Sequence, residues 1–152
     1  MLELSSISQG VYMTDQTLQS EFIVLQSWLN SKLIKKVEGQ LNIHGISFTE
    51  YMILRHLIEA PRNTLRRIEL AESVGISASG VTRLLSPMEK NKLVEKEVNI
   101  RDARVSLVKL TKIGQRVYKE ASVSFEHSAK FLTERLSTNQ LNTLIELTNK
   151  LI

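Results

Sequence analysis

The first regular pattern in the chain is a stripe of large apolar residues that repeats at intervals of three and four between residues 15 and 41. Its members are Leu18, Phe22, Leu25, Trp28, Leu29, Leu33, Val37 and Leu41. This spacing predicts a long amphipathic helix, since one face of a helix recurs every 3.6 residues. Ile23, Val24 and Ile34 add apolar surface outside the stripe. A helix that is apolar on more than one side is expected to contact two partners, its own domain and a second copy of the chain.

A second helix is predicted to begin after Ser47 and to end before Pro61. Ser47 and Glu50 have the spacing of a capping box, in which each side chain bonds the backbone N–H of the other residue. Ile46 and Tyr51 lie on either side of this box, where two apolar side chains can pack as a staple. Pro61 ends the helix because the residue before a proline avoids helical backbone angles.

Two further helices are predicted between residues 64 and 91, joined by a tight turn. Thr64 is expected to cap the first helix, and Gly75 is expected to end it in the left-handed conformation. The apolar positions of this first helix are Leu65, Ile68, Leu70, Ala71 and Val74. Ser77 is expected to cap the second helix, and Pro87 should bend or weaken its last turns because proline lacks an N–H.

The helix after Ser77 separates apolar from polar side chains. At 100° per residue, one face carries Val81, Leu84, Leu85 and Met88. The opposite face carries Ser79, Thr82, Arg83, Ser86 and Lys90. Such a helix is expected to pack on its domain through the first face and to leave the second face open to a partner.

Two short strands are predicted at residues 93–98 and 105–110, where apolar and polar residues partly alternate around a polar tip. Thr111 then begins a long helix. Its apolar positions are Ile113, Val117, Ala121, Phe125, Ala129, Leu132 and Leu136. Ser137 and Gln140 form another capping box, which starts a final helix. The predicted order is four helices, two strands and two helices, a mainly α fold with a small β-ribbon.

Composition excludes several classes of protein. A chain of 152 residues corresponds to one domain, and the absence of cysteine excludes disulfides, thiolate metal sites and thiol redox sensing. No apolar run approaches the roughly 18 residues of a membrane span, and the first residues lack the basic and apolar regions of a signal peptide. We therefore expect a soluble cytoplasmic protein without membrane contact.

The positive charge is concentrated in one part of the chain. Residues 61–110 carry ten Lys and Arg against six Asp and Glu, whereas residues 1–60 carry four against six. Binding to nucleic acid requires a local excess of positive charge, because each bound phosphate must be neutralised. This excess lies on the helix pair and ribbon, which favours double-stranded DNA as the partner.

The helix after Gly75 has a surface suited to the major groove, where base edges carry a distinct pattern of donors and acceptors. Small or polar side chains near its start allow close approach. The candidate DNA-binding residues of this helix are Ser77, Ala78, Ser79, Thr82, Arg83 and Ser86. Arg83 can pair with guanine through two hydrogen bonds, and Ser77 with the free first-turn amides could hold a phosphate. The alternative is an ordinary solvated helix face.

The tip of the ribbon adds a second candidate DNA contact. Arg101 and Arg104 would suit a narrow minor groove, where the negative potential is enhanced. Asp102 lies between them and could hold a guanidinium through a charge-assisted hydrogen bond. The alternative is an exposed ion pair of little energetic consequence.

This combination resembles the MarR family of bacterial winged helix-turn-helix transcription regulators. The matching segments are Glu69-Leu70-Ala71, Gly75-Ile76-Ser77, Val81-Thr82-Arg83, Asp102 with Arg104, and Leu110-Thr111 with Gly114. A D-x-R wing followed by L-T-x-x-G after a helix-turn-helix is fairly specific, although each piece alone is not. The flanking helices have the order of the family, so the resemblance covers residues 15–152.

The resemblance implies a homodimer that binds a pseudo-palindromic operator. Residues 15–42 and 111–152 would form the dimerisation helices, and residues 47–110 would form the DNA-binding lobe. It further implies that Arg104 enters the minor groove, oriented by Asp102.

The chain departs from the family pattern at two positions. Lys92 stands where the family usually has glycine, so we expect Asn91 to take the left-handed conformation instead. Ala103 stands where an arginine often occurs, and Arg101 is expected to restore that charge.

Many members of this family bind small, often phenolic anions. The candidate ligand-binding residues here are Trp28, His44, Tyr51 and Arg55, for which core packing or a solvated surface is the simpler interpretation. His44, His56 and His127 lack the mutual spacing and nearby carboxylates of a metal site, so no metal or cofactor is expected.

The sequence therefore predicts a sequence-specific transcriptional repressor that acts as a homodimer, with a small aromatic or anionic ligand as the candidate releasing signal. The alternative is a winged-helix module for protein–protein contacts, such as an adaptor or anti-repressor. No phosphate-binding glycine loop, H-E-x-x-H or G-x-S-x-G motif is present, so an enzyme is not expected.

Overall fold

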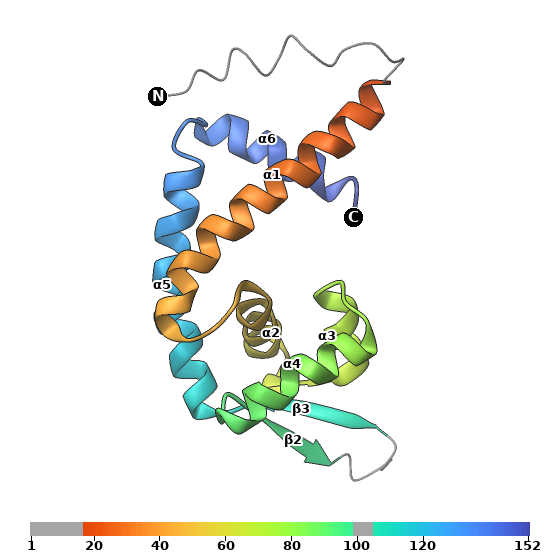
Figure 1. Cartoon of the computed structure of the whole chain (residues 1–152), viewed down its shortest axis with the longest axis vertical. Helices are drawn as coiled ribbons and strands as arrows, with labels where there is room; N and C mark the ends of the chain where they lie inside the picture. The colour runs from red at the N-terminus through yellow and green to blue at the C-terminus, as the bar shows by residue number, and fades with distance from the viewer. Residues whose placement is uncertain (1–16, 99–104) are drawn as a thin grey trace. The chain divides into compact units, whose positions relative to one another are not determined.

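The computed structural model describes residues 17–98 and 105–152 (Figure 1). Its contacts divide the chain into two compact units, residues 1–33 and 34–152, and the division falls inside the first helix. The helices are α1 (Leu18–Leu41), α2 (Phe48–Glu59), α3 (Arg67–Ser73), α4 (Ala78–Lys90), α5 (Lys112–Leu132) and α6 (Thr138–Asn149). Short 3-10 helices follow α1 (η2, Asn42–His44) and α2 (η3, Pro61–Asn63). The strands are β1 (Thr64–Arg66), β2 (Val94–Val98) and β3 (Ser106–Leu110).

Helices α2, α4, α5 and α6 begin after the residues predicted to cap them. The Ser47 hydroxyl accepts from the Glu50 N–H at 3.2 Å, and the Glu50 carboxylate accepts from the Ser47 N–H at 2.8 Å. The same capping box starts α6 at Ser137 and Gln140. The hydroxyl of Thr111 caps α5 by accepting from the third residue of that helix. These side chains bind amides that a helix start otherwise leaves without partners.

The predicted turn between α3 and α4 is confirmed at Gly75, whose φ is 67°. Its N–H donates to the Glu72 carbonyl, and the Ile76 N–H donates to the Ala71 carbonyl at 3.0 Å. This is the Schellman arrangement, which bonds the last carbonyls of a helix and reverses the chain. It fixes the start of α4 relative to α3.

One strand was not predicted. Thr64 was expected to cap α3 and Leu65 to lie inside it, but both belong to β1, and α3 begins at Arg67. Leu65 pairs with Val108, so β1 joins the sheet antiparallel to β3, in the order β1-β3-β2. The expectation was wrong because a strand of three residues has too few positions to show alternation, and its partner lies more than forty residues away.

The hydrophobic core lies entirely in the second unit. It contains Val37, Leu41, Ile46, Tyr51, Ile53, Leu54, Leu57, Leu70, Ala71, Val81, Leu85, Met88, Leu93, Val94, Val108, Leu110 and Ala121. These residues come from the end of α1, from α2 to α5, and from the sheet. The core therefore joins the helix pair and the ribbon into one rigid support for the surface of α4.

Lys92, rather than Asn91, adopts the left-handed conformation after α4. The φ angle of Lys92 is 58°, whereas that of Asn91 is −82°. The Lys92 N–H donates to the Glu89 carbonyl and the Leu93 N–H donates to the Met88 carbonyl, both at 2.9 Å. The expectation for Asn91 was wrong because these two hydrogen bonds require the left-handed residue at position 92, whatever its side chain.

The end of α4 is attached directly to the start of α5. The Thr111 N–H donates to the Leu93 carbonyl at 3.1 Å, and the Thr111 hydroxyl donates to the Lys92 carbonyl. Gly114 lies against the same backbone, since a Cβ on this residue would stand 2.1 Å from the Leu93 oxygen. The L-T-x-x-G motif therefore joins the helix pair to α5.

Helices in both units expose large apolar side chains. In the first unit these are Leu18, Phe22, Ile23, Val24, Leu25, Trp28 and Leu29 of α1. In the second unit they include Leu144, Ile145 and Leu147 of α6 and Leu151 and Ile152 after it. The proposed division into dimerisation helices and a lobe stays a prediction. Across residues 17–98 and 105–152, no helix has the length and apolar character needed to cross a membrane.

Candidate nucleic-acid interface

Helix α4 buries the predicted face and exposes the other. Val81, Leu85 and Met88 are at most 1% exposed and hold the helix on the core. The six candidate contact residues, Ser77, Ala78, Ser79, Thr82, Arg83 and Ser86, are all exposed. The candidate side chains on and just before α4 therefore form one continuous, mostly polar surface.

Ser77 acts first as the cap of α4. Its hydroxyl accepts from the Gly80 N–H at 3.1 Å and lies 3.1 Å from the hydroxyl of Ser79. Because its oxygen is bound to the backbone, Ser77 holds the first turn in place, and the exposed Ser79 hydroxyl lies beside it. Ser79 is the better-placed group for a contact with a base or a phosphate.

Thr82 and Arg83 occupy the centre of the exposed surface. The Thr82 hydroxyl donates to the Ala78 carbonyl at 2.9 Å and accepts a long hydrogen bond of 3.4 Å from Nη1 of Arg67. Within residues 17–98 and 105–152, Arg83 makes no ion pair. Its guanidinium keeps the planar set of donors that matches the edge of guanine.

Arg66 and Arg67 extend the positive surface and were missed in the sequence. A concavity of about 320 Å³ is lined by Arg66, Arg67, Ile68, Ala78, Val105 and Ser106. The Nε atom of Arg67 is buried and has no hydrogen-bond partner among the described residues. The adjacent arginines before the helix pair were a visible signal, but the wrong helix start at Thr64 obscured their position at the edge of the interface.

The ribbon is confirmed, while its tip lies outside the described residues. Val94 pairs with Leu110 and Val98 pairs with Ser106, so β2 and β3 form the predicted antiparallel pair. Arg101, Asp102 and Arg104 fall within residues 99–104, which the structure does not describe. Their roles stay predictions.

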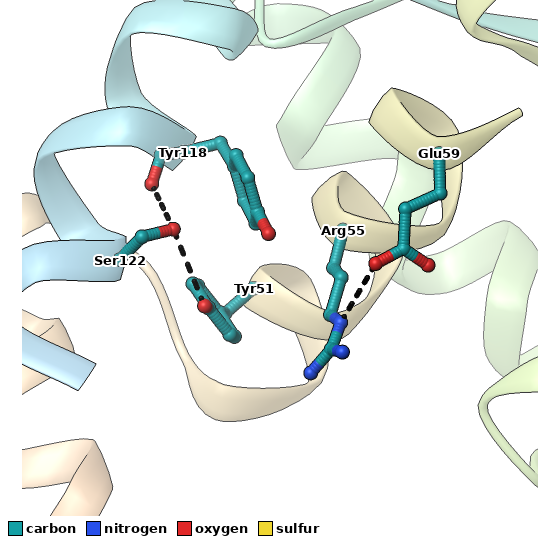
Figure 2. Close-up of polar contacts among 5 residues, drawn as sticks. All are labelled: Tyr51, Arg55, Glu59, Tyr118 and Ser122. Atoms are coloured by element: carbon teal, nitrogen blue, oxygen red, sulfur yellow. Dashed lines mark hydrogen bonds and ion pairs between the residues drawn. The ribbon is translucent and has the colours of Figure 1, made fainter. Parts of the chain in front are cut away.

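Tyr51, a candidate ligand contact, is part of the core and is 3% exposed. Its ring stacks against Tyr118 and Phe125 of α5, with centroid separations of 5.3 and 4.8 Å (Figure 2 shows the rings of Tyr51 and Tyr118). The Ser122 hydroxyl donates to the Tyr118 carbonyl at 2.8 Å, so the Tyr51 hydroxyl donates to Ser122 at 3.3 Å. Burial raises the pKa of Tyr51, because the phenolate loses solvation.

Each of the other candidate ligand contacts has a neighbour of its own among the described residues, and their role in binding a ligand stays a prediction. Arg55 is paired with Glu59 at 3.1 Å on the surface of α2 (Figure 2). His44 lies 2.8 Å from the Ser124 hydroxyl of α5 through Nε2. Trp28 belongs to the first unit, is 57% exposed and carries the Lys32 ammonium 4.8 Å above its ring.

Comparison with known proteins gives a consistent picture. Residues 44–105 match the model of the MarR family. The chain is 27% identical over 124 residues to the transcriptional repressor MprA of Escherichia coli K12, covering 82% of this chain and 70% of that protein. It is 27% identical over 109 residues to the homoprotocatechuate degradative operon repressor of Escherichia coli, covering 72% of each chain.

Solved structures agree with these sequence relatives. Sco3205, a MarR family transcriptional regulator from Streptomyces coelicolor in complex with DNA, has a TM-score of 0.80 and 25% identity, covering 93% of this chain and 91% of that one. A MarR variant from E. coli complexed with operator DNA has a TM-score of 0.79 and 23% identity, covering 90% of this chain and 99% of that one.

Proposed function

Because this chain belongs to the MarR family of transcriptional regulators, we propose that it is a sequence-specific DNA-binding repressor that acts as a homodimer. The observation that carries this proposal is the exposed surface of α4, which places Ser79, Thr82 and Arg83 together on a helix held from behind by the core. A rigid helix with small polar groups and the exposed guanidinium of Arg83 fits the major groove of DNA.

Arg66 and Arg67 are proposed to contact the DNA backbone beside α4. Both line the concavity next to Ala78, at the edge of the surface that faces the bases. The Arg66 guanidinium is paired with the Glu69 carboxylate, with Nε and Oε1 4.0 Å apart. Both side chains are about half exposed, so this ion pair is weak and can open. Arginines at the edge of a base-reading surface typically hold phosphates and set the position of the protein on the duplex.

The wing is proposed to add a minor-groove contact through Arg104, braced by Asp102, with Arg101 supplying further positive charge. The support is the confirmed pairing of β2 with β3, which brings the chain out to residue 98 and back from residue 105 beside α4. The positive charge of the tip matches the enhanced negative potential of narrow A·T tracts.

A homodimer is proposed from the apolar side chains that the single chain leaves uncovered. Leu144, Ile145 and Leu147 of α6 are each about half exposed, and the exposed side of α1 carries Leu25 and Trp28. Soluble monomers rarely expose many large apolar side chains on their helices, so a second copy is the expected cover for each of these helices. Two copies related by a two-fold axis would present two α4 helices to half-sites about 34–36 Å apart.

Release by a small aromatic or anionic ligand stays a prediction. Tyr51 is packed between two rings of α5 and hydrogen-bonded to Ser122, so a ligand that used it would have to displace part of the core. A panel of aromatic acids, screened by melting temperature, tests the prediction, because a ligand that binds the folded state raises that temperature.

The reading residues are tested with a double substitution, Arg83→Ala with Arg104→Ala. Binding to the DNA recovered from a random duplex pool should fall at least about thirtyfold, since two arginine contacts of about 1–3 kcal/mol each are lost. Lys150→Ala, at the end of α6, is the control for loss of charge alone. Unchanged binding by the double variant would show that the bases are read by other residues.

The alternative function, a winged-helix module for protein contacts, is distinguished from DNA binding by measuring the affinity for duplex DNA at several salt concentrations. The affinity of a DNA-binding protein for duplex falls steeply as salt rises, because bound phosphates release their counterions. A protein-contact module would show no measurable affinity for duplex at low salt.

A further inference from the structure

On the surface proposed to face DNA, the Thr82 hydroxyl already forms hydrogen bonds within the protein. It donates its one proton to the Ala78 carbonyl at 2.9 Å, and one of its lone pairs accepts from Nη1 of Arg67 at 3.4 Å. A threonine hydroxyl has a single proton, so in this arrangement it has none to give to guanine or to the acceptor atoms of adenine and thymine. The polar half of Thr82 is therefore turned back toward the protein.

The other half of the side chain is a methyl group. Both groups are attached to Cβ, and the hydroxyl is held against the preceding turn of α4, so the methyl group points away from that turn. Thr82 is exposed and lies next to Arg83, the residue proposed to read guanine. The outward surface at this position is therefore apolar although the residue type is polar.

Base pairs offer one apolar group in the major groove, the C5-methyl group of thymine. We propose that Thr82 determines specificity by packing its methyl group on a thymine methyl, and that Arg67 is a positioning residue that holds the Thr82 hydroxyl away from the bases. This inference rests on the proposed DNA-binding function and assigns one base of the operator to one protein group.

The test uses deoxyuridine, which differs from thymidine only by lacking the C5-methyl group. Operator DNA is selected from a random duplex pool with the whole protein, and each thymine of a half-site is then replaced singly by uracil. One replacement should weaken wild-type binding about fourfold, which corresponds to about 0.8 kcal/mol for one buried carbon. Thymines contacted by other residues give a loss that does not depend on position 82.

Two variants separate the methyl group from the hydroxyl. Thr82→Ser removes the methyl group and keeps the hydroxyl, so it should bind the thymine and uracil forms of that site equally. Thr82→Val keeps a methyl group and removes the hydroxyl, so it should retain the fourfold preference. The melting temperature of each variant shows that the fold is intact.

The opposite pattern overturns the inference. If Thr82→Ser keeps the preference for thymine, or if folded Thr82→Val loses it, the hydroxyl or another residue is the reading group. If the pool yields no preferred sequence, the proposed sequence-specific function itself fails and this inference fails with it. The two failures are therefore distinguishable.

The role of Arg67 has its own readout. Arg67→Met removes the guanidinium and keeps much of the side-chain length, and it should lower the thymine-to-uracil ratio at the site assigned to Thr82. An arginine that only bound phosphate would lower the affinity for both DNAs equally and leave the ratio unchanged. An unchanged ratio would therefore exclude a positioning role for Arg67.

Discussion

Lys92 holds a backbone conformation that suits glycine, with a φ of 58°. The left-handed conformation destabilises a residue with a Cβ by about 1–2 kcal/mol. A glycine avoids this strain but loses more conformational entropy on folding, so the net gain in stability is smaller. Lys92→Gly should therefore raise the free energy of unfolding by up to about 1 kcal/mol and the melting temperature by about 2–4 °C. Urea and thermal unfolding at a fixed protein concentration measure the change.

Asn91→Gly is the matched control, because Asn91 has a φ of −82° and gains nothing from glycine. This substitution should lower stability by about 0.5–1 kcal/mol. A stabilising Asn91→Gly together with a destabilising Lys92→Gly would mean that the left-handed residue is Asn91.

Gly114 is required for the contact between the start of α5 and the end of α4. A Cβ at this position would stand 2.1 Å from the Leu93 oxygen and 2.7 Å from Cδ1 of Leu110. Because the Leu93 carbonyl is held by the Thr111 N–H, it cannot move away cheaply. Gly114→Ala should therefore destabilise the fold by about 2–4 kcal/mol, measured by urea unfolding.

The control for Gly114 is Gly39, inside helix α1, where an added Cβ would meet nothing within 4 Å. Gly39→Ala should stabilise the protein by about 0.5–1 kcal/mol, because alanine loses less backbone freedom on folding. Equal effects of the two substitutions would contradict the close approach at Gly114.

Tyr51 makes stability depend on pH in the alkaline range. Burial raises its pKa in the folded state above the ordinary value of 10.0. As pH rises above that value, the unfolded chain loses the tyrosine proton while the folded chain keeps it, so stability falls. Below that value the contribution is fully present.

Tyr51→Phe removes both this dependence and the hydrogen bond with Ser122. At neutral pH the variant should be about 0.5–1.5 kcal/mol less stable than wild type, and the difference should shrink as pH rises above about 10. Urea unfolding from about pH 8 to about pH 11 measures this difference. A difference that stays constant would mean that Tyr51 titrates normally in the folded state.

At the scale of elements, local chemistry predicted the helices well and long-range pairing poorly. Ser47, Ser77, Thr111 and Ser137 each mark a helix start, because capping depends on residues within one turn. Strand β1 could not be predicted in the same way, since three residues become a strand only by pairing with β3. The conformation of Lys92 is similar, because it is imposed by hydrogen bonds across the end of α4.

In the candidate interface, too, local features could be predicted from the sequence and contacts between distant residues could not. Helical spacing alone predicts that Thr82 and Arg83 share an exposed face, and the structure confirms their exposure. The spacing does not predict that the Thr82 hydroxyl points inward, because this depends on the Ala78 carbonyl and on Arg67, fifteen residues away. It also does not predict that Tyr51 is covered by rings of α5, since that contact joins residues about seventy positions apart.

At the scale of the whole molecule, dimerisation can be tested through α6. Leu147 is 51% exposed and lies on the same side of the helix as Leu144. Leu147→Glu should weaken self-association at least about tenfold, because burying an unpaired carboxylate in an interface costs several kcal/mol. Sedimentation equilibrium measures the dissociation constant.

Asn142→Glu is the control. This substitution introduces the same charge as Leu147→Glu, but Asn142 is exposed on the opposite side of α6. It should leave self-association unchanged. If both variants dissociate equally, net charge rather than the apolar surface is responsible, and if neither dissociates, α6 lies outside the interface.

The junction between α4 and α5 has a mechanical consequence. The Leu93 carbonyl is bound by Thr111 and covered by Gly114, so the turn after α4 is fixed against the first turn of α5. Helix α5 has 21 residues and is therefore about 30 Å long, so a tilt of about 5° about one end moves the other end by about 2.6 Å. In the proposed dimer, α5 would therefore act as a lever arm, and a small displacement at its far end would shift the exposed face of α4 relative to DNA.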